Sequence, residues 1–150
     1  GVEVTGLRDN SLQGDRVCRE MLRRLREPGA GLDLAPCPDL GPILFAAAAR
    51  GHGAVFAGTR RLRIKESDRV AAMAQELAKF GVRVQAEENR VTVLPGGITA
   101  PTEELDGHND LSVLAASAGG TINGAEAVNK SYPDFFDALR TLGLTIEIRS

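Results

Sequence analysis

A pattern that combines a helix, a glycine and a short strand recurs three times along this chain of 150 residues. Before each glycine, apolar residues follow the spacing of one helical face, and after it they alternate with the period of a strand. The three copies cover residues 21–34, 73–84 and 139–146, with their glycines at Gly31, Gly81 and Gly143. Because helices and strands occur together in repeated units, the pattern predicts an α/β fold and excludes a purely helical bundle.

The same periodicities predict the remaining elements. Helices are expected at residues 18–25, 43–49, 70–77, 111–118 and 135–142. Strands are expected at 1–5, 32–34, 54–56, 121–123 and 144–148, and a hairpin with a turn at 87–89 is expected over 82–93. Residues 100–110 are polar and are predicted to form a loop, and Cys18 is predicted to lie in the core.

Composition excludes several functional classes. The chain has 18 Lys and Arg against 20 Asp and Glu, so its net charge of -2 provides no overall field that would attract nucleic acid. Aromatic residues make up only 4%, too few for a base-stacking surface. No apolar run approaches the ~20 residues that a membrane span needs, and no secretory leader precedes the first helix. These features predict a cytoplasmic globular protein without a nucleic-acid or membrane partner.

The densest group of charges lies in residues 60–69 and leads directly into a helix. Lys65, Glu66 and Arg69 fall around the first helical turn, where exposed main-chain N–H groups favour anions. Arg69 offers a planar fork for a carboxylate or phosphate, and Lys65 a mobile charge. This arrangement is typical of a site for a small anion, but a solvated helix start with internal ion pairs or a DNA-facing patch would have the same composition. If the segment is only a solvated helix start, Glu66 would simply cap the helix.

Other candidate residues are ambiguous by position alone. Asp39 precedes the apolar run 43–49, which favours the role of helix N-cap over that of a catalytic carboxylate. Lys130, by itself, is typical of a surface lysine. His52 and His108 have no metal-ligand spacing, and the two cysteines, Cys18 and Cys37, do not form a C-x-x-C motif. The sequence therefore predicts no metal site.

Four motifs in this order resemble the C-terminal part of the 5-enolpyruvylshikimate-3-phosphate synthase family. The most specific is Arg61-Leu62-Arg63-Ile64-Lys65-Glu66-Ser67-Asp68-Arg69, which is similar to the family's R-x-K-E-[ST]-D-R signature. The others are Asn10-Ser11-Leu12-Gln13-Gly14-Asp15, Gly107-His108-Asn109-Asp110 and Lys130-Ser131-Tyr132-Pro133-Asp134-Phe135-Phe136. The resemblance covers nearly the whole chain.

This resemblance implies an α/β fold of repeated βαβαββ units, which form two lobes of the inside-out α/β barrel type with helices buried inside sheets. Residues 1–150 would be an incomplete C-terminal lobe, without the N-terminal lobe, and would be inactive alone. The full-length parent is expected to be a monomer.

The resemblance also implies the chemistry. The family transfers the enolpyruvyl group of phosphoenolpyruvate to the 5-hydroxyl of shikimate 3-phosphate and releases phosphate, on the route to chorismate and the aromatic amino acids, without metal or organic cofactor. Asp39 would accept the hydroxyl proton, and Glu66 would be the acid and base at the methylene carbon. Lys65 would contact the shikimate 3-phosphate side, and Arg69 and Lys130 would bind phosphoenolpyruvate.

One departure from the family pattern concerns the segment after Asp110. The family continues there with His-Arg, whose arginine binds phosphoenolpyruvate, whereas Leu111 follows here directly. We expect the His-Arg segment to be missing from the sequence as given and not from the protein itself. Two alternatives remain: the sister transferase that acts on UDP-N-acetylglucosamine, which the K-E-S-D-R run disfavours, and a non-catalytic anion-binding or interaction module on the same scaffold.

Overall fold

The computed structural model describes residues 10–64, 68–108, 115 and 117–148. Its helices are α1 (Cys18–Arg24), α2 (Gly41–Arg50), α3 (Arg69–Lys79) and α5 (Phe135–Thr141). Its strands are β1 (Gly31–Asp33), β2 (Ala54–Ala57), β3 (Val84–Ala86), β4 (Arg90–Val93), β5 (Leu105–Asp106) and β6 (Ile122–Asn123). Short 3₁₀ helices are η1 (Gly14–Val17), η2 (Pro38–Leu40), η3 (Thr59–Arg63) and η4 (Ala125–Lys130).

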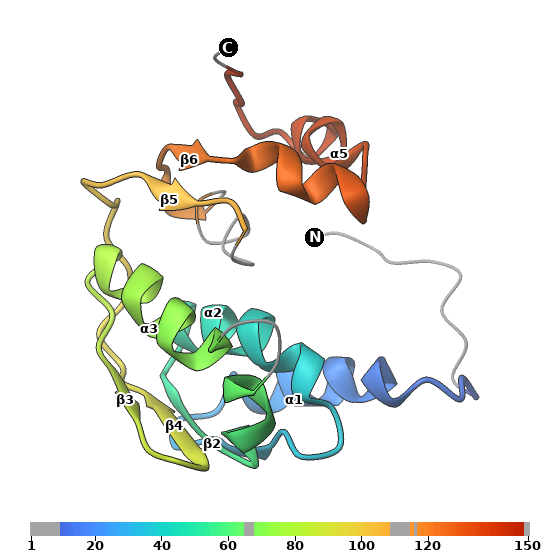
Figure 1. The fold of residues 1–150 in the computed structure, drawn as a ribbon, viewed down its shortest axis with the longest axis vertical. Coiled ribbons are helices and arrows are strands. Elements are labelled where there is room, and N and C mark those ends of the chain that lie inside the picture. The colour runs from blue at the N-terminus through green and yellow to red at the C-terminus, as the bar shows by residue number, and fades with distance from the viewer. Residues whose placement is uncertain (1–9, 65–67, 109–114, 116, 149–150) are drawn as a thin grey trace.

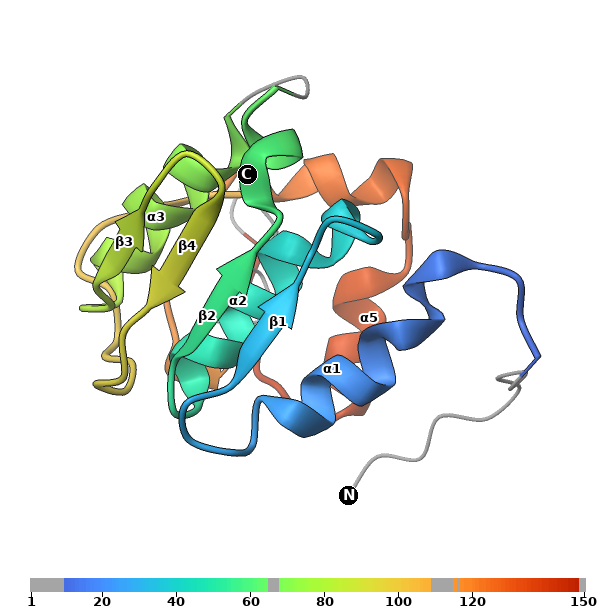
Figure 2. The ribbon, with the colours of Figure 1, turned by 90° about the horizontal axis from the view of Figure 1, so that it is seen from below.

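The larger sheet contains four strands in the order β1-β2-β4-β3 (Figure 2). Strands β1 and β2 are parallel, and β4 is antiparallel to both of its neighbours. From β1 to β4 the elements therefore follow the order strand, helix, strand, helix, strand, strand. This is the βαβαββ unit that the resemblance implied, and the predicted hairpin over residues 82–93 is confirmed as its last two strands.

Helices α1, α2 and α3 cover one face of this sheet, and the β5–β6 pair and α5 lie on the far side of these helices (Figure 1). Alternate strand residues point toward the helices: Leu32, Phe56, Val91 and Val93 are buried, whereas their strand neighbours are more exposed. Helix α2 is buried along most of its length, with several alanines that allow close packing. Its burial between layers agrees with the expected incomplete lobe, in which helices lie inside sheets.

Three predictions about local structure were wrong. Residues 144–148 alternate as predicted but form no strand, because no described strand lies beside them to complete a hydrogen-bonded ladder. The predicted loop 100–110 contains β5, which pairs with β6. Cys18 is only partly buried, and Cys37 is the buried cysteine. The strand predicted at 1–5 and most of the helix predicted at 111–118 lie outside the described residues.

Candidate active site

The carboxyl ends of β1 and β2 approach each other closely at Gly58. Leu34 N donates to Ala57 O at 2.9 Å, and the Asp33 carboxylate accepts a bond from Ala35 N at 3.0 Å. Gly58 has a φ of 70°, and a Cβ atom there would lie 2.5 Å from Ala35 N and still closer to the Asp33 carboxylate. Only glycine fits this position, so the chain segments that leave the two strands start side by side.

These segments are η2 after β1 and η3 after β2, and they remain in contact at the start of α2. The Leu62 side chain of η3 is fully buried. Its Cδ1 atom lies 2.8 Å from where a Cβ atom of Gly41 would stand, so the missing side chain at the first residue of α2 makes room for η3. Loops at the carboxyl ends of parallel strands are where α/β proteins place ligands.

At this edge the structure joins Asp39 and Arg69. Arg69 Nη1 lies 3.3 Å from Asp39 Oδ1. The prediction that Asp39 caps a helix was wrong, because Asp39 lies inside η2 and Leu40 occupies the N-cap position of α2 without a side-chain bond. Because the Asp39 carboxylate does not cap the helix, it can form a tertiary contact. Its partner is Arg69, the first residue of α3.

The Asp39–Arg69 ion pair is partly exposed to solvent. The Asp39 side chain is 58% exposed and that of Arg69 is 33% exposed, so both reach solvent. An ionised carboxylate can accept a proton, and a guanidinium is a cation whose planar N–H donors suit an anionic ligand. The two side chains could therefore serve a substrate that carries both a hydroxyl to be deprotonated and a negatively charged group.

Asp68 and Arg63 organise the entry into α3. Asp68 is the N-cap residue, and its Oδ1 accepts a bond from Ala71 N at 2.9 Å. Its Oδ2 lies 3.3 Å from Arg63 Nη1, and Arg63 Nη2 also donates to Glu87 O at 2.7 Å. The internal ion pairs foreseen for a helix start are thus present in part. Arg63 and Asp68 flank in sequence the predicted site residues Lys65 and Glu66, which themselves lie outside the described residues.

Lys130 is the last residue of η4 and is exposed. In the part of the chain that the structure describes, no hydrogen bond or ion pair joins it to Asp39 or Arg69. Among the described residues, the structure therefore brings together two of the predicted site residues, Asp39 and Arg69, and shows no bond from Lys130 to either of them.

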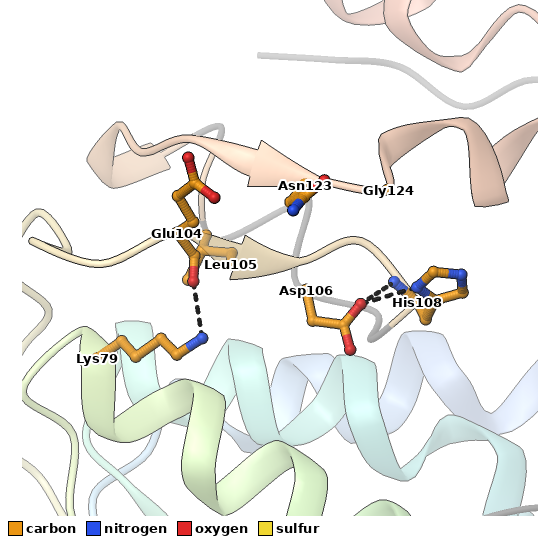
Figure 3. A pocket seen from close by; sticks show the side chains of 7 residues that line it. All are labelled: Lys79, Glu104, Leu105, Asp106, His108, Asn123 and Gly124. Carbon is orange, nitrogen blue, oxygen red and sulfur yellow. Dashed lines mark hydrogen bonds and ion pairs between the residues drawn. The ribbon is translucent and has the colours of Figure 1, made fainter.

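A second polar cluster, which sequence reasoning missed, lies where α3 meets β5 (Figure 3). Glu76 is 5% exposed and pairs with Lys79, whose Nζ lies 2.7 Å from Glu76 Oε1. Glu76 Oε2 accepts a bond from Asp106 N at 3.2 Å, and Lys79 Nζ donates to Glu104 O at 2.7 Å. The i,i+3 spacing of Glu76 and Lys79 was visible in the sequence, but nothing there indicated their partners on β5.

His108 belongs to the same region. Its main-chain N–H donates to Asp106 Oδ1 at 3.0 Å, and its Nδ1 lies 2.8 Å from the same oxygen. These bonds, with the nearby positive charge of Lys79, hold the pKa of the Asp106 carboxyl below its usual value. Asp106 and His108, with Lys79, Asn123 and Gly124, line an open pocket of about 370 Å³.

The described residues contain neither a candidate metal-binding cluster nor a candidate membrane-spanning helix. No group of three or more His, Cys, Asp or Glu side chains among them is arranged to hold a metal ion. No helix within the described ranges has both the length and the apolar character that a membrane crossing requires.

Comparisons with known proteins agree on one family. A family model described as EPSP synthase (3-phosphoshikimate 1-carboxyvinyltransferase) matches residues 1–139. The chain is 35% identical to the 3-phosphoshikimate 1-carboxyvinyltransferase of Clostridium kluyveri over 173 residues, which covers 98% of this chain and 40% of the relative. It is 36% identical to the enzyme of the same name from Halorubrum lacusprofundi, over 97% of this chain and 34% of the relative.

A solved structure is also similar. The structure of EPSP synthase from Acinetobacter baumannii superposes with a TM-score of 0.68 at 30% identity, over 78% of this chain and 30% of that one. The chain thus spans about two fifths of the length of the curated relatives it matches. The alignment of 173 residues is longer than the 150 residues of the chain, so the clostridial relative contains residues without a counterpart here.

Proposed function

The chain belongs to the EPSP synthase family, and on this premise we propose that it is the C-terminal lobe segment of an enzyme that transfers the enolpyruvyl group of phosphoenolpyruvate to shikimate 3-phosphate. The acceptor is the 5-hydroxyl group, and phosphate is released. The rest of the enzyme supplies a second lobe, and the substrates bind between the two lobes. The assembled enzyme is a monomer that needs no metal or organic cofactor.

The observation that carries this proposal is the Asp39–Arg69 pair at the carboxyl ends of β1 and β2. The reaction needs a carboxylate that accepts the proton of the attacking hydroxyl, and a fixed cation that holds phosphoenolpyruvate next to it. Asp39 supplies a carboxylate and Arg69 a guanidinium. Both are accessible to solvent, and Arg69 Nη1 lies 3.3 Å from Asp39 Oδ1. We assign the proton acceptor to Asp39 and a phosphoenolpyruvate contact to Arg69.

The remaining roles complete the reaction. Glu66 delivers a proton to the methylene carbon of phosphoenolpyruvate, and the neighbouring carbon becomes cationic. The 5-hydroxyl oxygen attacks that carbon while Asp39 takes the hydroxyl proton, which gives a tetrahedral intermediate. Glu66 then removes a methyl proton as the C–O bond to phosphate breaks, so the double bond is restored. Lys65 contacts shikimate 3-phosphate, and Lys130 is a further cation for phosphoenolpyruvate.

The test is phosphate release by the full-length enzyme that contains this segment. With phosphoenolpyruvate and shikimate 3-phosphate both present, we expect release of one phosphate per enolpyruvyl group transferred. Omission of shikimate 3-phosphate should stop the release, and Glu66→Gln should nearly abolish it because the amide cannot supply the proton.

Three outcomes would overturn the proposal. Full activity of the Glu66→Gln enzyme would remove the assigned acid. Release of phosphate with UDP-N-acetylglucosamine in place of shikimate 3-phosphate, and not with shikimate 3-phosphate itself, would assign the segment to the sister transferase. A full-length protein that responds to neither acceptor would support a non-catalytic module.

A further inference from the structure

Helix α3 connects two polar regions of the molecule. Its first residue, Arg69, contacts Asp39, and its last two turns carry Glu76 and Lys79, which contact β5. Arg69 and Glu76 are seven residues apart, about two helical turns, so they lie along the same side of the helix. Helix α3 therefore joins the Arg69–Asp39 contact at its first residue to the Glu76 and Lys79 contacts at its last turn.

The contact between α3 and β5 is made by a pair of opposite charges that is largely withdrawn from water. The Glu76 side chain is 6% exposed and that of Lys79 is 18% exposed. Pairing such charges costs desolvation, so a buried pair is weak evidence of stabilisation, and apolar residues of similar volume often serve stability as well or better. The pair also has a geometric consequence, because both side chains bond to the main chain around β5.

Each charge also bonds to the main chain of β5 or of the residue just before it, on opposite sides of one buried residue. Glu76 accepts from Asp106 N and Lys79 donates to Glu104 O, whereas the intervening Leu105 is 1% exposed. Two directional bonds to a donor and an acceptor two residues apart fix the register of the strand on the helix. An apolar contact through Leu105 alone would allow the strand to slide or rotate.

The register of β5 in turn sets the position of His108. With the Asp106 main-chain N–H bonded to Glu76, the Asp106 carboxylate lies on the pocket side, where it accepts a bond from the His108 main-chain N–H and lies 2.8 Å from His108 Nδ1 (Figure 3). A chain of contacts thus runs from Glu76 through Asp106 to His108. His108 lies in the Gly107-His108-Asn109-Asp110 motif, one of the four on which the family resemblance rests.

We propose that Glu76 and Lys79 are positioning residues, which fix strand β5 and the Asp106–His108 pair relative to helix α3 and its Arg69. The proposal rests on the proposed function only in that Arg69 is taken to bind substrate. The pair acts through the register of β5 and touches no reacting atom.

The first experiment measures amide hydrogen exchange in the full-length protein. Glu76→Leu/Lys79→Leu replaces the pair by apolar residues, and Glu103→Gln is the matched control, because Glu103 is an exposed carboxylate next to the same strand. In the double variant we expect the Asp106 and His108 amides to exchange at least about tenfold faster, while the Val55 amide, bonded to Ala30 O in the main sheet, keeps its rate. A role in overall stability alone would change all three rates together, and this result, or unchanged rates, would overturn the proposal.

The second experiment measures turnover of the same variants. The double variant should keep its melting temperature within a few degrees and lose about tenfold in kcat/KM, because the site is displaced but intact. Glu76→Gln keeps an acceptor for Asp106 N and should recover part of the loss, and Glu103→Gln should match the parent. Unchanged kcat/KM in the double variant would overturn the proposal even if exchange at Asp106 is faster.

Failure of the proposed function would look different from failure of this inference. A parent enzyme without activity toward phosphoenolpyruvate and shikimate 3-phosphate would refute the function, while the exchange experiment would still decide whether the pair fixes β5.

Discussion

The Asp39 carboxylate and the Arg69 guanidinium lie 3.3 Å apart, although their residues are separated by 30 positions in the chain. The first stands in the segment after β1 and the second begins the helix after β2. Because these strands are parallel, both segments leave the sheet at the same edge. The close approach at Gly58 and the burial of Leu62 hold the segments together, so the Asp39–Arg69 contact depends on the sheet and not on local sequence.

Loss of the Asp39 carboxylate should reduce turnover of the full-length enzyme. Asp39→Asn keeps the size of the side chain but removes the carboxylate that we propose as the proton acceptor, so kcat should fall by about 10²–10⁴-fold. Phosphate release measures this. Asp137→Asn, which alters a surface carboxylate paired with Arg140 at 2.6 Å, is the control and should change kcat less than twofold. Equal activity of the Asp39 variant and the control would refute the assignment.

The N-cap of α3 should make a measurable contribution to stability. Asp68→Ala removes the bond from Ala71 N and the ion pair with Arg63, and we expect the free energy of unfolding to drop by about 1–2 kcal/mol. Asp134→Ala is a matched control, because Asp134 occupies the N-cap position of α5 without a side-chain cap bond. Urea denaturation compares the two. Equal losses would show that the cap bond is not the cause.

Gly58→Ala should destabilise the protein more than a glycine replacement at an open position. Gly58 and Gly97 both have positive φ values, 70° and 75°, but a Cβ atom at Gly97 would meet nothing within 4 Å. Gly97→Ala should therefore cost about 1 kcal/mol, from backbone strain alone. Gly58→Ala should cost at least about 1 kcal/mol more, because the ends of β1 and β2 must move apart. Similar unfolding midpoints for the two variants would contradict the close approach.

The Asp106–His108 contact predicts a pH dependence of stability with a definite sign. The pKa of Asp106 is lowered in the folded protein, chiefly by bonds from the His108 main chain and side chain. Its contribution is therefore complete above the unfolded value of about 3.9 and is lost as the pH falls through the lower folded value. Urea denaturation between pH 6 and pH 2.5 should show the difference between parent and Asp106→Asn shrinking at the acid end. A difference that grows toward low pH would reverse the assignment.

Thiol reactivity should separate the two cysteines. Burial raises the pKa of both thiols, with a smaller contribution from Asp15, so little thiolate forms near neutral pH. Cys37 is also enclosed, with its Sγ atom 3.9 Å from Met21 Sδ. Cys18, which is partly exposed, should react with a disulfide reagent at pH 8 before Cys37, and both should react at once in guanidinium chloride. Reaction of Cys37 first in the native protein would contradict its burial.

Much of the fold could be predicted from local patterns. The apolar spacing of α3, the alternation of β3 and β4 and the turn between them all appear in the structure as expected. The predicted secondary structure was wrong where strand formation depended on a neighbouring strand. Residues 144–148 alternate like a strand but have no ladder beside them in the described part of the chain. Leu105 and Asp106, inside the predicted loop, form β5 because β6 pairs with them.

The sequence by itself determined the α/β class, the helix that begins at Arg69 and, through four motifs, the family. These depend on periodicity and on neighbours in the chain, which a sequence displays directly. Only the tertiary structure decided that Asp39 pairs with Arg69 instead of capping α2, and that Glu76 and Lys79 hold the main chain of β5. Each of these contacts joins residues at least 25 positions apart, and the parallel sheet and the packing of its helices, not local propensity, bring such residues within bonding distance.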